Sequence, residues 1–130
     1  MIRRVVFCCA ALLVLAARPV FAESSAVRGC LERMTGAEQK QCTEAVYRAA
    51  TVELETLYRR AVDAAVRPDV SGRAAAIAAS QAAWEAYRDA ECRGLVGLGG
   101  GSGRPVWVYG CLAEKTFERI RELKVPFDQR

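Results

Sequence analysis

The sequence predicts an all-α domain, a small bundle of three to four helices held together by two disulfides. Three observations lead to this fold class. Apolar residues recur at intervals of three and four along most of the chain, which is the periodicity of helices packed on one face. No segment has the pattern of a strand of useful length. Four cysteines remain once an N-terminal leader is set aside, and 130 residues suffice for one domain.

Residues 1–22 have the pattern of a secretory signal peptide. Arg3 and Arg4 make a basic start, an apolar run follows, and the small side chains of Val20 and Ala22 precede the expected cleavage point. The apolar run is short for a membrane span, so an uncleaved anchor is the less favoured alternative. The sequence therefore predicts a domain of residues 23–130 that has no transmembrane segment after cleavage.

The leader holds three of the basic residues and no acidic residue. Subtracting these three from the 19 basic residues leaves 16 against 15 acidic residues, a net charge of +1. A nearly neutral domain has no broad electrostatic attraction for nucleic acid or anionic membranes. We therefore expect no nucleic-acid partner.

The domain's cysteines are Cys30, Cys42, Cys92 and Cys111. An even number in a small exported chain predicts two disulfides. Of the three possible pairings, Cys30–Cys42 and Cys92–Cys111 are favoured, because each closes a short local loop. A zinc site is the rival interpretation, but the spacing is not that of paired CxxC motifs and the chain has no histidine. We expect no metal and no cofactor, and a periplasmic or secreted location.

Two short segments precede the first long helix. Residues 23–28 are expected to be a mobile polar lead-in, and Cys30–Met34 has the length of one helical turn. Thr35 and Glu38 have the spacing of a capping box that starts the long helix. We expect this helix to end at Arg67–Pro68, because the residue before a proline avoids helical geometry. Its apolar stripe consists of Val46, Ala50, Leu54, Leu57, Ala61 and Ala65.

The second long helix is predicted from Arg73 to about Leu95, with Asp69 or Ser71 as its cap. It is rich in alanine, the strongest helix former. One face combines a large aromatic ring with polar and ionisable groups, which need partners or water. That face consists of Gln81, Trp84, Arg88, Glu91 and Leu95.

Gly97–Gly103 contains five glycines in seven residues and is not expected to form a regular helix. It is either a flexible connector between the ends of a disulfide or a loop presented for contact. Pro105 suits the first turn of a third helix, which we expect to end at Val125–Pro126. Gly110 within this helix indicates close packing. The apolar stripe includes Cys111, Leu112, Thr116, Ile120 and Leu123, with Arg119 at its edge.

Several of these residues together resemble a known family. The segments are Gln81-x-x-Trp84-x-x-x-Arg88-Asp89-x-x-Cys92, the Gly101-Ser102 loop, and Cys111-x-x-x-x-Thr116-x-x-Arg119-x-x-x-Leu123. With the four cysteines they resemble the LprI-type lysozyme-inhibitor-like family of small secreted helical proteins, over nearly all of the mature chain. The resemblance implies a disulfide-bonded helical domain. Because some members are linked to inhibition of host lysozyme, it also implies lysozyme as a partner.

Arg88 has two interpretations. Asp89 is expected to point away from it, so Arg88 would pair with Glu91 or with an acid of the first helix such as Glu53 or Glu55. In the structural interpretation it belongs to a network that joins three helices. The members of that network would be Gln81, Trp84, Arg88, Glu91 and Thr116. In the binding interpretation Arg88 or Arg119 is exposed and contacts a partner's carboxylate.

A lysozyme cleft carries two catalytic carboxylates, and a polar or basic loop can block it. Ser102 and Arg104 in the glycine-rich loop are the candidates for this contact. We expect no enzyme activity and no catalytic residues, because the chain has no histidine and its cysteines are expected to be oxidised. The alternative function is a structural or interaction module of the cell envelope without lysozyme activity.

Overall fold

The computed structural model describes residues 24–66 and 72–128, and this part of the chain is helical without any strand. The predicted signal peptide, the expected helix end at Arg67–Pro68 and the expected caps Asp69 and Ser71 lie outside the described residues. The predicted all-α fold is confirmed. The elements are α1 (Ser25–Leu31), α2 (Gly36–Ala65), α3 (Arg73–Asp89), a π-helical turn (Ala90–Leu95), a 3₁₀ turn (Val96–Leu98) and α4 (Arg104–Asp128).

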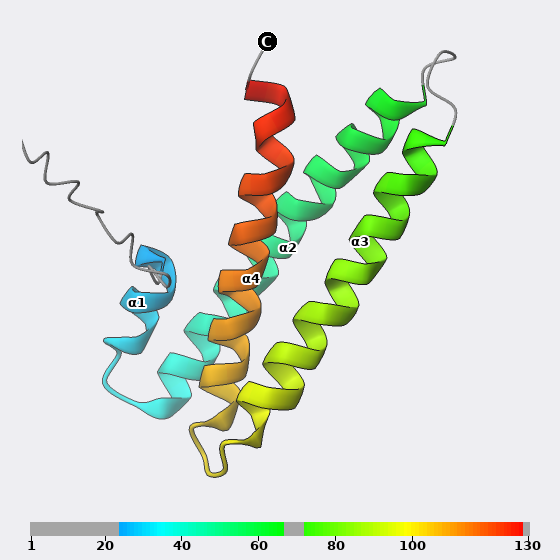
Figure 1. Cartoon of the computed structure of the whole chain (residues 1–130). Coiled ribbons are helices and arrows are strands. Elements are labelled where there is room, and N and C mark those ends of the chain that lie inside the picture. The colour runs from blue at the N-terminus through cyan, green and yellow to red at the C-terminus, as the bar shows by residue number, and fades with distance from the viewer. Residues whose placement is uncertain (1–23, 67–71, 129–130) are drawn as a thin grey trace, which may run out of the picture.

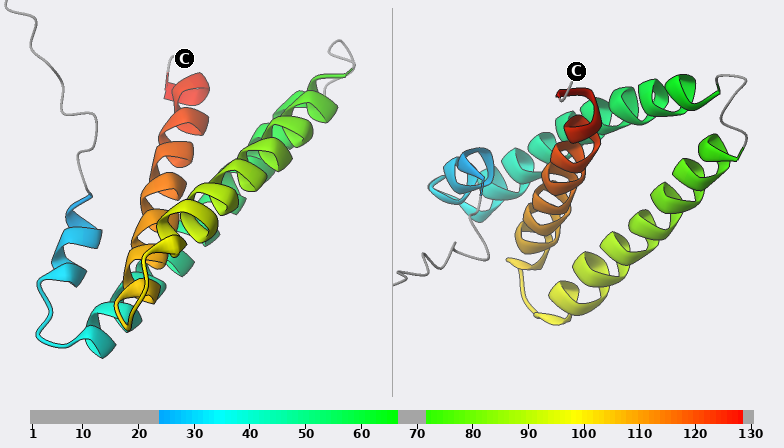
Figure 2. Two further views of the ribbon diagram at one scale, coloured as in Figure 1. Left: turned by 60° about the horizontal axis from the view of Figure 1, so that its bottom comes forward. Right: turned by 45° about the horizontal axis from the view of Figure 1, so that its top comes forward.

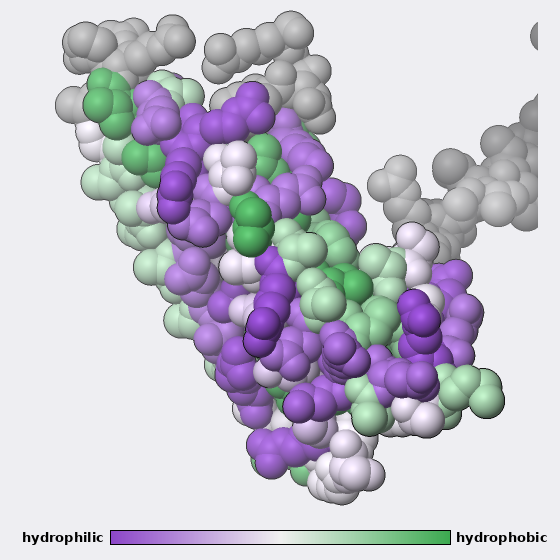
Figure 3. Space-filling model, turned by 180° about the vertical axis from the view of Figure 1, so that it is seen from behind, coloured by the Kyte–Doolittle hydropathy of each residue, from purple (hydrophilic) through white to green (hydrophobic). Residues whose placement is uncertain are grey.

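Helices α2 and α3 run antiparallel as a hairpin, and α4 packs across α2 (Figures 1 and 2). The α2–α4 contact is the most extensive in the molecule, and the short α1 packs on α2 near its start. The outer face of α2 is largely hydrophilic, with isolated apolar side chains (Figure 3). None of the described helices is both long and apolar enough to span a membrane.

The lead-in before α2 differs from the prediction. Residues 24–28 are not a mobile segment, because Ser24 caps α1 by accepting a bond from the Val27 N–H at 3.3 Å. The Ser24 backbone N–H and hydroxyl also donate to Glu114 of α4, at 2.6 and 2.7 Å. The helix begins earlier than Cys30 and ends at Leu31, before Met34. A partner 90 residues away in the sequence therefore fixes the N-terminal helix.

The start of α2 follows the prediction. The Glu38 N–H donates to the Thr35 hydroxyl at 3.2 Å, and the Thr35 N–H donates to the Glu38 carboxylate at 3.0 Å, which is a complete capping box. The predicted stripe faces the core, although Val46 is only partly buried. The core contains Ala50, Leu54, Leu57 and Ile120, with Trp84, Phe117 and Leu123 packed against them.

The start and end of α3 correct two predictions. Gly72 occupies the cap position in a left-handed conformation, with φ of 88°, so no side chain caps the helix. The α-helix ends at Asp89 instead of near Leu95 and continues as the π-helical turn. The wider turn changes the angular phase of the side chains that follow. Leu95 is consequently 64% exposed and does not share the Trp84 face as predicted.

The last helix also extends beyond its predicted end. Pro105 lies in its first turn as expected, but α4 continues past Val125–Pro126 to Asp128. A proline so near the C-terminus removes a hydrogen bond only from the final turn, so it does not stop the helix. Gly110 is buried and allows α1 to approach, since a Cβ there would lie 3.5 Å from a Val27 methyl group.

Both predicted disulfides are confirmed. Cys30–Cys42 joins α1 to α2 with a Cα–Cα distance of 5.3 Å, and Cys92–Cys111 joins the π-helical turn to α4 with 5.5 Å. The first bridge attaches the short N-terminal helix. The second closes a loop around the glycine-rich segment, with its two cysteines 19 positions apart in the sequence.

Replacing both cysteines of either bridge by alanine should lower the free energy of unfolding by about 3 kcal/mol, because the unfolded chain regains the freedom of a closed loop. Urea unfolding followed by circular dichroism measures this change. A loss below about 1 kcal/mol for both pairs would contradict the prediction.

Candidate functional site

Arg88 of α3 is buried where α3 faces α2. Its residue is 8% exposed, and its guanidinium carbon lies 4.9 Å from the centre of the Trp84 ring and 5.8 Å from that of Tyr47 in α2. Its Nε donates to Asp89 at 2.9 Å, and a second guanidinium nitrogen lies 2.8 Å from the same oxygen. The Arg88 charge is therefore compensated by one carboxylate and two aromatic rings.

The ion pair of Arg88 corrects the sequence prediction. Asp89 is its partner, whereas Glu91 and the acids of α2 are not. Adjacent residues diverge at Cβ, but the long arginine side chain reaches back to its neighbour's carboxylate. Glu53 instead pairs with Lys124 at 2.7 Å, and Glu55 pairs with Arg59 one turn along its own helix.

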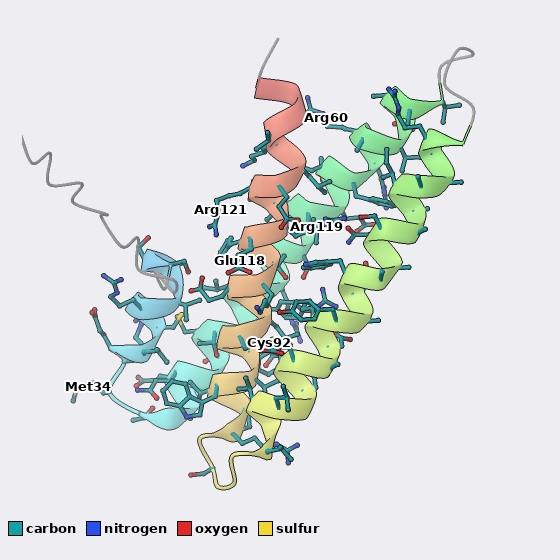
Figure 4. The ribbon with its side chains drawn as sticks, in the orientation of Figure 1. Met34, Arg60, Cys92, Glu118, Arg119 and Arg121 are labelled. Carbon is teal, nitrogen blue, oxygen red and sulfur yellow. A yellow bond between two sulfur atoms is a disulfide. The ribbon has the colours of Figure 1, made fainter. Side chains whose placement is uncertain are left out.

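Arg119 extends from α4 toward α3 (Figure 4). Its Nε donates to the Gln81 side-chain oxygen at 3.2 Å, and a terminal nitrogen donates to the Ser80 hydroxyl at 2.9 Å. The guanidinium carbon lies 5.8 Å from the Trp84 ring centre, and Glu122 supplies an ion pair at 2.9 Å. The structure thus places Gln81 beside Arg119, where the sequence analysis placed it near Arg88.

Two other predicted network members have separate roles. The Thr116 hydroxyl is fully buried and donates to the Leu112 carbonyl of its own helix at 2.7 Å. Glu91 forms no hydrogen bond or ion pair with any residue that the structure describes. The guanidinium–aromatic network therefore consists of Tyr47, Gln81, Trp84, Arg88, Asp89 and Arg119, with Ser80, Glu85 and Glu122 at its edge.

A second contact between α3 and α4 lies outside this network. Lys115 donates to the Tyr87 hydroxyl at 3.0 Å, and its nitrogen lies 5.2 Å from the Tyr87 ring centre. The hydrogen bond to Tyr87 raises the pKa of Lys115 above its usual 10.5, burial opposes this shift, and Glu118 adds to it. This contact supports the same packing of α4 on α3.

An open groove of about 280 Å³ runs beside the network, between α2 and α3. Arg88 and Gln81 form part of its wall, so the network borders the surface at this point. The other lining residues are Thr51, Leu54, Glu55, Tyr58, Arg59 and Glu85. These described residues include two carboxylates and two guanidiniums, which give the groove no single charge preference.

The glycine-rich segment forms a defined turn at one end of the bundle. The Gly99 N–H donates to the Val96 carbonyl, the Arg104 N–H donates to Gly101, and Gly101 has a φ of 91° that favours glycine. Ser102 and Arg104 are both exposed. Arg104 forms no ion pair with any described residue, and its guanidinium lies against Gly97.

A second hollow, of about 380 Å³, lies beside this loop. It is lined by Ser102, Gly103, Val106 and Trp107 on one side and by Gly36, Ala37, Gln39 and Lys40 of α2 on the other. Sequence reasoning did not single out Lys40 or Trp107. A signal was available, because Trp107 is a large aromatic residue that follows shortly after the glycine-rich loop and lies off the apolar stripe of α4.

The fold and these features define a small helical domain with two disulfides, a polar network inside and an exposed loop at one end. Residues 25–123 match the family model described as lysozyme inhibitor LprI. The chain is also similar to the uncharacterized protein R02472 of Rhizobium meliloti (strain 1021), with 37% identity over 106 residues, 73% of this chain and 76% of the relative. No solved structure matches the chain. The chain belongs to the LprI lysozyme inhibitor family, as its sequence motifs predicted.

Arg88→Ala should lower the free energy of unfolding by about 2 kcal/mol, because it removes two cation–π contacts and the packing of the arginine stem. Asp89 is partly exposed and is hydrated after the change, so no buried charge is orphaned. Thermal and urea unfolding measure the loss.

Arg59→Ala is the matched control, because Arg59 forms an exposed pair on α2 and its loss should cost below about 0.5 kcal/mol. Arg88→Lys should restore only part of the stability, since an ammonium group does not stack on rings as a guanidinium does. Equal losses for Arg88→Ala and Arg59→Ala would contradict a structural role for Arg88.

Proposed function

We propose that this protein is an exported, non-enzymatic binding protein that inhibits a lysozyme by blocking its cleft. Family membership supports lysozyme as the partner. Two disulfides support a periplasmic or extracellular location, where such bonds persist. The observation that carries the proposal is the disulfide-tied end of the bundle, where the glycine-rich loop exposes Ser102 and the first residue of α4 exposes Arg104.

The loop has the chemistry that a lysozyme cleft requires. The cleft holds two carboxylates, and a hydroxyl together with a guanidinium donates hydrogen bonds to such groups. Arg104 is free to do so, because it forms no ion pair with any residue that the structure describes. Cys92–Cys111 restricts the loop before binding, so less conformational entropy is lost when it enters a cleft.

Arg88 and Arg119 are better assigned to stability than to partner binding. Both guanidiniums already have hydrogen-bond acceptors and contact Trp84. Using either of them at an interface would break contacts that hold α3 in place. We therefore propose Ser102 and Arg104 as the lysozyme contacts and keep Arg88 and Arg119 as structural residues.

The proposal is tested by the lysis of a peptidoglycan suspension by c-type lysozyme, with and without the purified, oxidised protein. We expect dose-dependent protection that reaches its end point at one inhibitor per lysozyme. If a folded protein in large excess gives no protection, lysozyme inhibition is excluded. The function would then be that of a cell-envelope interaction module with another partner.

Replacing Ser102 and Arg104 together by alanine should weaken inhibition by about tenfold or more, as expected when central polar contacts of an interface are removed. The melting temperature should stay the same, because both side chains are exposed. Arg73→Ala is the control, because Arg73 is exposed at the start of α3, at the end of this helix that lies away from the glycine-rich loop. Undiminished inhibition by the double variant would show that another surface makes the contact.

A further inference from the structure

The hollow beside the glycine-rich loop contains none of the residues of the guanidinium–aromatic network around Trp84. We call it the Trp107 groove, and it lies between the first turns of α2 and α4. Its volume of about 380 Å³ is large enough for a protruding side chain of a partner. The cap and loop residues that form its walls are held in place by the capping box and by Cys92–Cys111.

Trp107 is the main apolar feature of this groove. The side chain is 59% exposed, whereas its neighbour Val106 is 3% exposed and supplies the core contact of this helical turn. The Trp107 Nε1 lies 3.6 Å from the position of a Cβ at Gly103, so the ring leans over the loop. An exposed tryptophan of this kind contributes little to folding but is the residue type most enriched at the centres of protein interfaces.

The polar groups of the groove favour an anionic partner group. Among the described residues that line it, Lys40 is the one that carries a charge and none is a carboxylate. Glu38, close by in α2, is engaged with the Thr35 backbone and hydroxyl. The Gln39 amide donates to the Leu31 and Arg33 carbonyls, at 2.9 and 3.0 Å, and so holds the wall in place. The Lys40 ammonium and the Ser102 hydroxyl remain as hydrogen-bond donors.

We infer that the Trp107 groove is the anchoring part of the lysozyme contact, and that it takes an acidic side chain from the rim of the lysozyme cleft. Trp107 supplies apolar contact area, Lys40 binds the carboxylate, and the adjoining loop enters the cleft with Ser102 and with Arg104 at the start of α4. This inference rests on the proposed function. It adds that affinity depends on Trp107 and Lys40, which lie outside the loop motif.

The inference is tested with Trp107→Ala and Lys40→Glu in the purified, oxidised chain, by measuring the inhibition constant and the dissociation constant for c-type lysozyme. Each change should raise the inhibition constant and the dissociation constant by about tenfold or more, as at an interface hot spot. The melting temperature of Lys40→Glu should match that of the unchanged protein. Lys40 is exposed, so its replacement should leave the fold intact. If Trp107→Ala lowers stability, the binding of Lys40→Glu to lysozyme therefore still tests the inference.

Two variants serve as matched controls. Arg60→Glu makes the same charge change toward the other end of α2 (Figure 4), and Tyr87→Ala removes an exposed aromatic ring from α3. Both should bind lysozyme within about twofold of the unchanged protein, since surface changes away from an interface have small effects. If Arg60→Glu weakens binding as much as Lys40→Glu, the loss of affinity comes from the change in net charge, and the groove is not the anchor.

The remaining outcomes separate the inference from the proposed function. If the unchanged protein inhibits lysozyme and both groove variants do so equally well, the groove is excluded while inhibition stands. If the unchanged protein does not bind lysozyme, the proposed function fails and the groove assignment fails with it. Binding to purified peptidoglycan that depends on Trp107, without binding to lysozyme, would make the groove a sugar site and would also overturn the inference.

Discussion

The burial of the Arg88 guanidinium beside Trp84 is the constraint on which the packing of α3 depends. Gln81 and Arg88 are the buried residues of α3, and both are polar. Most of the other side chains of this helix are alanines, which bury little apolar area. The position of α3 against α2 and α4 therefore depends more on the network around Trp84 than on an apolar seam.

A buried cation stabilises a fold only if it is well compensated. Arg88 meets this condition because Asp89 lies within hydrogen-bond distance and remains partly hydrated, so the pair is not fully removed from water. Trp84 also contacts Arg119 from α4, while Tyr47 of α2 contacts Arg88. Two aromatic rings and two guanidiniums thus connect α2, α3 and α4, and no buried side-chain polar atom among the described residues lacks a partner.

The features that were predicted correctly have local signals in the sequence. The Thr35–Glu38 capping box, the stripe of α2 and the two short-range disulfides each depend on residues close together in the chain. The features that were missed depend on distant contacts or on a change of helical geometry. α1 is fixed by Glu114, which lies 90 residues from Ser24, and the π-helical turn after Asp89 moves Leu95 off the Trp84 face. The ion pair between Arg88 and Asp89 was also missed. The Cβ atoms of adjacent helical residues point apart, but the arginine side chain is long enough to reach the neighbouring carboxylate.

The candidate site could be predicted only in part from the sequence, because it too depends on contacts between residues that are distant in the chain. The glycine-rich loop was recognisable by composition, but its neighbour across the groove is the start of α2, more than 60 residues earlier in the chain. The two tryptophans illustrate the difference that packing makes. Trp84 is enclosed by guanidiniums and the core, whereas Trp107 lies on the surface beside a tied loop. A ring in the first environment stabilises the fold. A ring in the second leaves apolar area exposed that a partner can cover, and the restricted segment beside it loses less conformational entropy on binding.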